Sequence, residues 1–168
     1  MSMSPWMDQK EIDLIKHYLT PTDVMLEWGS GGSTVTFSPL VTKYYSIEHV
    51  KDWYTKVDQE IKKQELEDRI TNILQEPDQP RTIPTKYSEF KSYIELPSTL
   101  GVNFNKVLID GRGRQYCALF ILDYLLPGAK VFIHDFWKRP QYHHVLEHYR
   151  EVASVKDTVQ TLVVLEKN

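Results

Sequence analysis

The sequence has a single cysteine, no long hydrophobic run and no excess of basic residues. Cys117 alone cannot form an internal disulfide and argues against a cysteine-rich zinc site, which fits a reducing compartment. No apolar segment approaches the roughly 20 residues of a membrane span, and the N-terminus has no secretory apolar core. The net charge of −3 offers no basic field for nucleic acid or anionic lipid. We expect a soluble cytoplasmic protein that neither binds nucleic acid nor inserts into a membrane.

The hydrophobic pattern of the 168 residues alternates between strand and helix and fits a single domain. Such alternation favours an α/β fold, with a parallel sheet and helices on both faces. Residues 151–167 are two β runs, a hairpin that adds an antiparallel edge. Strands are predicted over 24–26, 43–47, 69–74, 106–109 and 129–133, and helices over 8–19, 33–40, 50–67, 115–126 and 141–150.

The segment E-W-G-S-G-G-S-T, residues 27–34, directly follows the first predicted strand. Its glycines allow a sharp turn and the close approach of a ligand. A nicotinamide dinucleotide fingerprint, G-x-G-x-x-G, would need glycine where Thr34 stands. Glu27 would repel a pyrophosphate but suits the ammonium group of S-adenosylmethionine, which has no phosphate. Glu48, at the end of the second predicted strand, suits a ribose diol.

These motifs, together with Y-S-I-E-H, I-D-G-R-G-R and F-I-H-D-F-W, resemble the class I S-adenosylmethionine-dependent methyltransferases over roughly residues 22–165. The chain is also similar to small glycan-modifying O-methyltransferase domains of large algal viruses. The resemblance implies a Rossmann-like, mostly parallel seven-stranded sheet with a reversed last strand. It places the acceptor over Asp110, His134 and Asp135. The cofactor-binding residues that it implies are Glu27, Gly29, Ser30, Gly31, Ser33, Glu48, His49 and Asp110.

Asp110 and Asp135 end two adjacent predicted strands, a spacing similar to that of the metal-dependent catechol type of O-methyltransferase. That type adds magnesium as a candidate cofactor, with both aspartates as ligands. The sequence departs from it at two places, because the asparagine position is Phe136 and the catalytic lysine position falls on Gly113. Two carboxylates, waters and substrate oxygens would still satisfy Mg²⁺. Metal dependence therefore stays open.

Methyl transfer to a hydroxyl calls for a positioned base. His134 is the first candidate, because Asp135 beside it would raise its basicity and fix its tautomer. Asp110 is the rival base, or the group that orients the acceptor. Arginines after the fourth strand and aromatic residues after the fifth suit a polar, ring-shaped acceptor. The predicted substrate-binding residues are Arg112, Arg114, Trp137, Tyr142 and His143.

These residues together predict a methyltransferase that acts on a hydroxyl of a small polar acceptor, such as a sugar of a glycan. Two alternatives are N-methylation of an amine or protein side chain, and a non-catalytic binding module of the same fold. One domain of residues 1–168 has no separate recognition unit. The irregular segment 76–105, the N-terminal helix within 1–21, or a partner subunit must complete the acceptor pocket. For that reason we expect a homodimer.

Overall fold

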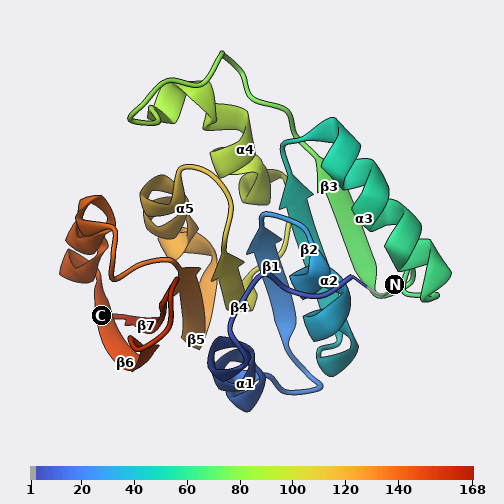
Figure 1. Ribbon diagram of the computed structural model, residues 1–168, viewed down its shortest axis with the longest axis horizontal. Helices are drawn as coiled ribbons and strands as arrows, with labels where there is room; N and C mark the ends of the chain where they lie inside the picture. The colour runs from blue at the N-terminus through green and yellow to red at the C-terminus, as the bar shows by residue number, and fades with distance from the viewer. Residues whose placement is uncertain (1–2) are drawn as a thin grey trace.

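A computed structural model describes residues 3–168 as a sheet with helices on both faces (Figure 1). No helix among these residues combines the length and apolarity needed to cross a membrane. The elements in chain order are α1 (Gln9–Tyr18), β1 (Val24–Trp28), α2 (Gly32–Phe37), η1 (Ser38–Leu40), β2 (Lys43–Glu48), α3 (Lys51–Lys63), β3 (Ile70–Leu74), η2 (Tyr87–Glu89), α4 (Lys91–Glu95), η3 (Leu96–Thr99), β4 (Phe104–Ile109), α5 (Arg114–Phe120), η4 (Ile121–Tyr124), β5 (Leu125–His134), η5 (Pro140–Glu147), β6 (Tyr149–Val155) and β7 (Leu162–Lys167).

The sheet has seven strands in the order β3-β2-β1-β4-β5-β7-β6. Strands β1 to β5 pair in parallel, whereas β7 runs antiparallel to both of its neighbours, β5 and β6. This arrangement confirms the predicted mostly parallel sheet with an antiparallel C-terminal hairpin.

The strands bury side chains on both faces, and each face has its own hydrophobic core. On one face Leu26 and Trp28 pack with residues of α4 and α5. On the other face Met25 packs with Ile15 of α1 and Ile61 of α3. Burial on both sides is what holds helices against each face of a parallel sheet.

Three predicted helices end earlier in the structure. The helix predicted over 50–67 ends at Lys63, because Glu65 has a positive φ of 57° and turns the chain. The helix predicted over 115–126 ends at Phe120, and β5 already begins at Leu125. Pro127 and Gly128, which separate the predicted helix from the predicted strand at 129–133, were expected to form a turn. These two residues lie inside β5, where the pairing with β4 shifts register and tolerates a proline.

The third difference lies after β5. The helix predicted over 141–150 is a 3₁₀-helix that ends at Glu147. Tyr149 begins β6, and its hydroxyl donates a hydrogen bond to the Ala118 carbonyl. Burial of Tyr149 against α5 thus takes this residue out of the predicted helix.

Strand register brings four motifs to one edge of the sheet. Trp28 pairs with both Ile47 and Ile109, and Ile109 pairs with Ile133. The residues that follow these positions are Gly29, Glu48, Asp110 and His134. Since the carboxyl ends of parallel strands meet at one edge, these four residues surround a single region, the usual binding edge of an open α/β sheet.

Candidate functional site

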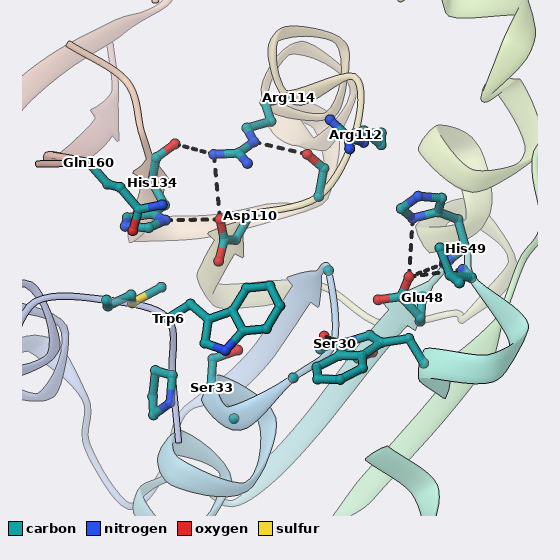
Figure 2. Close-up of a pocket in the computed structure, with 18 residues that line it drawn as sticks. Trp6, Ser30, Ser33, Glu48, His49, Asp110, Arg112, Arg114, His134 and Gln160 are labelled. Carbon is teal, nitrogen blue, oxygen red and sulfur yellow. Dashed lines mark hydrogen bonds and ion pairs between the residues drawn. The ribbon is translucent and has the colours of Figure 1, made fainter. Parts of the chain in front are cut away.

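A cavity of about 360 Å³ opens at this edge (Figure 2). A volume of this size is in the range of small-molecule sites. Its walls come from the N-terminal segment, the loop after β1, the β2–α3 connection, the ends of β4 and β5, and the loop between β6 and β7. The lining residues are 5–7, 29–33, 48–50, 53, 110–112, 114, 134 and 160.

The loop after β1 needs glycine at two positions for different reasons. Gly29 has a positive φ of 96°, and a Cβ there would lie 2.7 Å from the Asp110 carbonyl oxygen. A Cβ added at Gly32 would lie 2.0 Å from the Ser4 carbonyl carbon. The first glycine lets β1 and β4 end side by side. The second lets the N-terminal segment lie directly on the loop, as the chain trace across α2 shows (Figure 1).

Glu48 is held at the cavity wall with one carboxylate oxygen already used. Its side chain is buried, and Oε1 accepts hydrogen bonds from the backbone N–H groups of His49 and Val50, at 2.8 and 2.9 Å. Figure 2 shows the other oxygen turned toward the cavity. A buried carboxylate fixed by backbone donors, with one oxygen free, is a preorganised acceptor for ligand hydroxyls.

Glu27 lies beneath the loop and does not line the cavity. It is fully buried and accepts hydrogen bonds from the hydroxyls of Ser33, Thr34 and Ser46, the last at 2.8 Å. Burial raises the pKa of Glu27 to about 7, although these three hydroxyls oppose the shift. The residue therefore ties the loop to β1 and β2, whereas the prediction gave it direct contact with a ligand ammonium.

Two tryptophans flank the loop side of the cavity. The indole N–H of Trp53 donates to the Ser30 carbonyl at 2.6 Å. The Trp6 ring lies 5.7 Å from the Trp53 ring between centroids. Figure 2 shows Trp6 at the cavity mouth, between Asp110 and the glycine loop. Because its side chain is largely exposed, Trp6 offers a flat apolar surface to any ring that enters the cavity.

His134 bridges two carboxylates. Its Nδ1 lies 3.0 Å from Asp110 Oδ1, and its Nε2 lies 3.0 Å from Glu11 Oε2. The His134 and Glu11 side chains are 2% and 0% exposed. With both carboxylates ionised, each can only accept, so both ring nitrogens donate and the ring is an imidazolium.

The electrostatics of His134 agree with that geometry. Burial lowers its pKa, but the hydrogen bonds and charges of Asp110 and Glu11 outweigh burial, and the net pKa is raised above 6.5. A ring that donates through both nitrogens has no lone pair for a substrate proton. Asp110, which lines the cavity and keeps a 22% exposed side chain, is the better-placed acceptor of one.

Arg114 is a structural arginine at the same edge. Its Nε donates to the Gly111 carbonyl at 2.9 Å and its Nη1 donates to the His134 carbonyl. Nη1 also lies 3.4 Å from Asp110 Oδ1. Arg114 therefore joins the ends of β4 and β5 and helps to hold Asp110 in place, as the dashed lines of Figure 2 show.

The structure does not bring every predicted acceptor residue to the cavity. Asp135 has a positive φ of 62° and pairs with Arg139 at 2.7 Å, away from His134. The Trp137 indole donates to the Ser154 hydroxyl, and His143 donates to the Phe136 carbonyl. Trp137, Tyr142 and His143 thus lie outside the cavity lining, since the first two pack on the apolar core below η5 and the third against the Phe136 ring.

No metal centre forms from these side chains. Across residues 3–168 no group of three or more His, Cys, Asp or Glu side chains is arranged to hold a metal ion. Asp110 faces His134 and Arg114, and Asp135 faces Arg139. Both aspartates are committed to cationic partners, a donor set that does not fit Mg²⁺.

Three parts of the site were not predicted as site residues, although the N-terminal helix was one of the candidates to complete the acceptor pocket. Glu11, residues 5–7 and Trp53 all take part in it. Glu11 carries a local signal, because Asp8 and Glu11 form a capping box at the start of α1 and Glu11 shares a buried helix face with Ile15. Conversely, no residue of the 76–105 segment lines the cavity.

Comparison with known proteins rests on structure. The sequence matches no protein-family model and no curated protein. A methyltransferase-like protein of Silicibacter pomeroyi superimposes with a TM-score of 0.69 at 22% identity, over 99% of this chain and 90% of that one. A putative methyltransferase of Streptococcus mutans, solved with S-adenosylhomocysteine, gives 0.67 at 13% identity, over 96% and 100%. This chain has the class I methyltransferase fold.

A third structure widens the range of acceptors associated with the methyltransferase fold. An rRNA methylase of Streptococcus thermophilus gives a TM-score of 0.65 at 16% identity, over 92% of each chain. The predicted fold class is therefore confirmed. None of these structures points to the glycan-modifying subtype.

Proposed function

We propose that the protein is an S-adenosylmethionine-dependent methyltransferase that binds its cofactor between the glycine loop and Glu48. The observation that carries this proposal is the buried Glu48 carboxylate, fixed through Oε1 and turned into the cavity through its other oxygen. A free carboxylate oxygen at this place is an acceptor for the ribose hydroxyls of the cofactor.

The rest of the cofactor fits the neighbouring surfaces. Gly29, Ser30 and Gly31 present backbone to the ligand, and His49 extends the wall beside Glu48. Trp6 and Trp53 supply the apolar faces that an adenosine needs. Glu27 supports the loop from below instead of touching the ammonium group itself, because its carboxylate is bonded to the Ser33 and Thr34 hydroxyls, whereas Ser33 lines the cavity.

We infer that the acceptor is a hydroxyl of a small polar molecule, with a sugar of a glycan as our candidate. In the transfer the bond from the methyl carbon to sulfur breaks, a bond to the acceptor oxygen forms, and sulfur keeps the electron pair. The hydroxyl proton passes to Asp110, the cavity carboxylate nearest to His134. His134 and Arg114 are positioning residues for Asp110 in this scheme. Metal plays no part in it.

Calorimetric titration tests the cofactor. We expect S-adenosylhomocysteine to bind, NAD not to bind, and Glu48→Ala to weaken binding by about 10- to 100-fold, since hydrogen bonds to a charged group contribute about 1.5–3 kcal/mol. Glu67→Ala, an exposed acid after α3, is the matched control and should bind like the wild type. No binding of S-adenosylhomocysteine by the wild type would overturn the proposal and leave a non-catalytic module of the same fold.

A second experiment separates hydroxyl from amine acceptors. If Asp110 takes a hydroxyl proton, Asp110→Asn should lower kcat by about 10²- to 10⁴-fold in a screen of sugar acceptors while S-adenosylhomocysteine affinity stays near the wild-type value. An amine acceptor needs no strong base, so a small loss of kcat would favour N-methylation instead.

A further inference from the structure

Arg112 is an arginine at the cavity wall with no carboxylate partner. It follows β4 and lines the cavity with an exposed side chain. Within residues 3–168 its guanidinium makes no ion pair and no hydrogen bond to another side chain or carbonyl. Arg114, two residues further on, donates hydrogen bonds to the Gly111 and His134 carbonyls and forms an ion pair with Asp110. The two arginines of this turn therefore have different roles, and only Arg112 has its donors free for a ligand.

The charged residues that act most strongly on Arg112 are also positive. Partial burial at the cavity wall is the first cause that lowers the pKa of Arg112, the positive charges of Arg81 and Arg114 lower it further, and the Tyr142 and Tyr93 phenols oppose the shift. No carboxylate is among the main influences on the pKa of this guanidinium. Arg81 is also exposed, and it makes no ion pair in the described part of the chain. Arg112 and Arg81 carry like charges and neither is paired with a carboxylate in the described part of the chain, which favours an anion at Arg112.

Arg112 lies on a different side of the cavity from Glu48 and the glycine loop, where the cofactor is proposed to bind. Glu48 and the glycine loop follow β2 and β1, whereas Arg112 and Asp110 follow β4. Figure 2 shows the Arg112 side chain on the β4 side of the cavity, above Asp110 and beside Arg114. An acceptor hydroxyl at Asp110 would bring the remainder of the acceptor toward the mouth, where Arg112 lies. Arg81 of the segment 76–105 does not line the cavity, but its positive charge acts on Arg112.

We propose that the acceptor carries an oxyanion, a phosphate or carboxylate group, which Arg112 binds at the cavity wall while the acceptor hydroxyl faces Asp110. This inference rests on the proposed function and narrows its substrate class to anionic hydroxylated molecules. Arginine suits the role because its planar fork matches both oxyanions with two parallel hydrogen bonds.

The test uses inorganic phosphate and acetate as probes. Each is titrated at constant ionic strength into the protein saturated with S-adenosylhomocysteine, and the arginine Nε–H signals are followed by NMR. We expect saturable binding that shifts the Arg112 signal, weakened about tenfold in Arg112→Gln and less in Arg81→Gln, as for the loss of one charge-assisted contact. Arg150→Gln removes an exposed arginine of β6 that is paired with Glu166 of β7, so it is the charge-matched control and should bind both probes like the wild type. Tighter binding of phosphate or of acetate identifies which oxyanion the acceptor carries.

Other outcomes would overturn the inference. Phosphate and acetate binding that is absent, or is unchanged in Arg112→Gln, removes the anion site. If Arg112→Gln weakens S-adenosylhomocysteine tenfold but leaves methylthioadenosine unchanged, Arg112 holds the cofactor carboxylate instead. A short RNA oligonucleotide that binds far more tightly than phosphate, with a steep salt dependence, would assign the arginines to a nucleic-acid backbone. In all three cases S-adenosylhomocysteine still binds the wild type, which separates failure of this inference from failure of the proposed function.

Discussion

The two ends of the cavity are built in different ways. At the loop end, Glu27, the hydroxyls that bind it and Glu48 lie within about one β-α-β unit of sequence, and Glu27 bonds residues 6, 7 and 19 positions away. At the Asp110 end, His134 joins Glu11 across 123 positions and Asp110 across 24. The first end is a local structure. The second forms only when α1 and the ends of β4 and β5, which are far apart in the sequence, come together.

The two ends also use charge differently. The loop end buries one acid among neutral hydroxyls, which raises its pKa to about 7. The Asp110 end buries an imidazolium between two carboxylates, with an arginine nearby. A lone buried acid can be neutralised by a proton, whereas the buried ionic bridge loses stability as soon as one partner is removed. The comparison therefore yields distinct expectations for each end.

The largest effect is expected at the Asp110 end. Glu11→Ala leaves the His134 imidazolium with one carboxylate and removes the link between α1 and β5. Breaking a buried ion pair costs about 3–5 kcal/mol, so we expect a loss of about that size in the free energy of unfolding, measured by urea denaturation. Glu11→Gln keeps the shape and one acceptor and should cost less. Equal losses in the two variants would show that packing, not charge, holds α1.

At the loop end, Gly29→Ala tests the close approach of β1 and β4. Gly29 and Gly101 both have positive φ, but a Cβ at Gly101 meets nothing within 4 Å, so Gly101→Ala measures backbone strain alone. That strain costs about 1–2 kcal/mol. Overlap with the Asp110 carbonyl should add about 1–3 kcal/mol in Gly29→Ala and abolish S-adenosylhomocysteine binding. Equal stability of the two variants, or intact binding, would mean that the loop adjusts freely.

These contrasts explain which parts the sequence could predict. The glycine loop and Glu48 each follow a regular strand pattern, and that pattern was sufficient to predict a mostly parallel sheet and the position of the loop. The partner of His134 was misassigned to its sequence neighbour Asp135. A positive φ at Asp135 turns that carboxylate toward Arg139, while strand pairing delivers Asp110 to the ring.

The N-terminal contribution shows the same limit. The sequence indicated an amphipathic helix near the N-terminus, which α1 confirms. Hydrophobic periodicity shows that such a helix packs on the sheet, but it does not show which residues its polar side chains contact. Glu11 on the buried face and Trp6 before the helix reach the cavity only through tertiary packing. The predicted aromatic acceptor residues failed for the related reason that aromatic side chains pack on the core as readily as on ligands.

The pH dependence of stability sharpens the difference between the two buried acids. The pKa of Glu27 is raised from 4.5 to about 7, so the folded state keeps a proton that the unfolded state has lost. The contribution of this group is complete below pH 4.5 and falls as pH rises to about 7, with a slope of up to about 1.4 kcal/mol per pH unit. Glu27→Gln should remove this slope in urea denaturation at pH 5, 6 and 7, whereas Glu67→Gln should keep it. An unchanged slope in Glu27→Gln would assign the dependence to another group.

The smallest effect is expected one residue before Glu11. Lys10 forms an ion pair with Asp157 in the loop between β6 and β7, close in the chain to Thr158, which donates to Glu11. Both side chains of the Lys10 pair are about two-thirds exposed, so solvent screens their attraction. Lys10→Ala should therefore leave the free energy of unfolding and the binding of S-adenosylhomocysteine unchanged within error. A loss approaching that of Glu11→Ala would mean that α1 is held by its exposed edge as much as by the buried bridge, and that the contrast between buried and exposed charges does not apply to this helix.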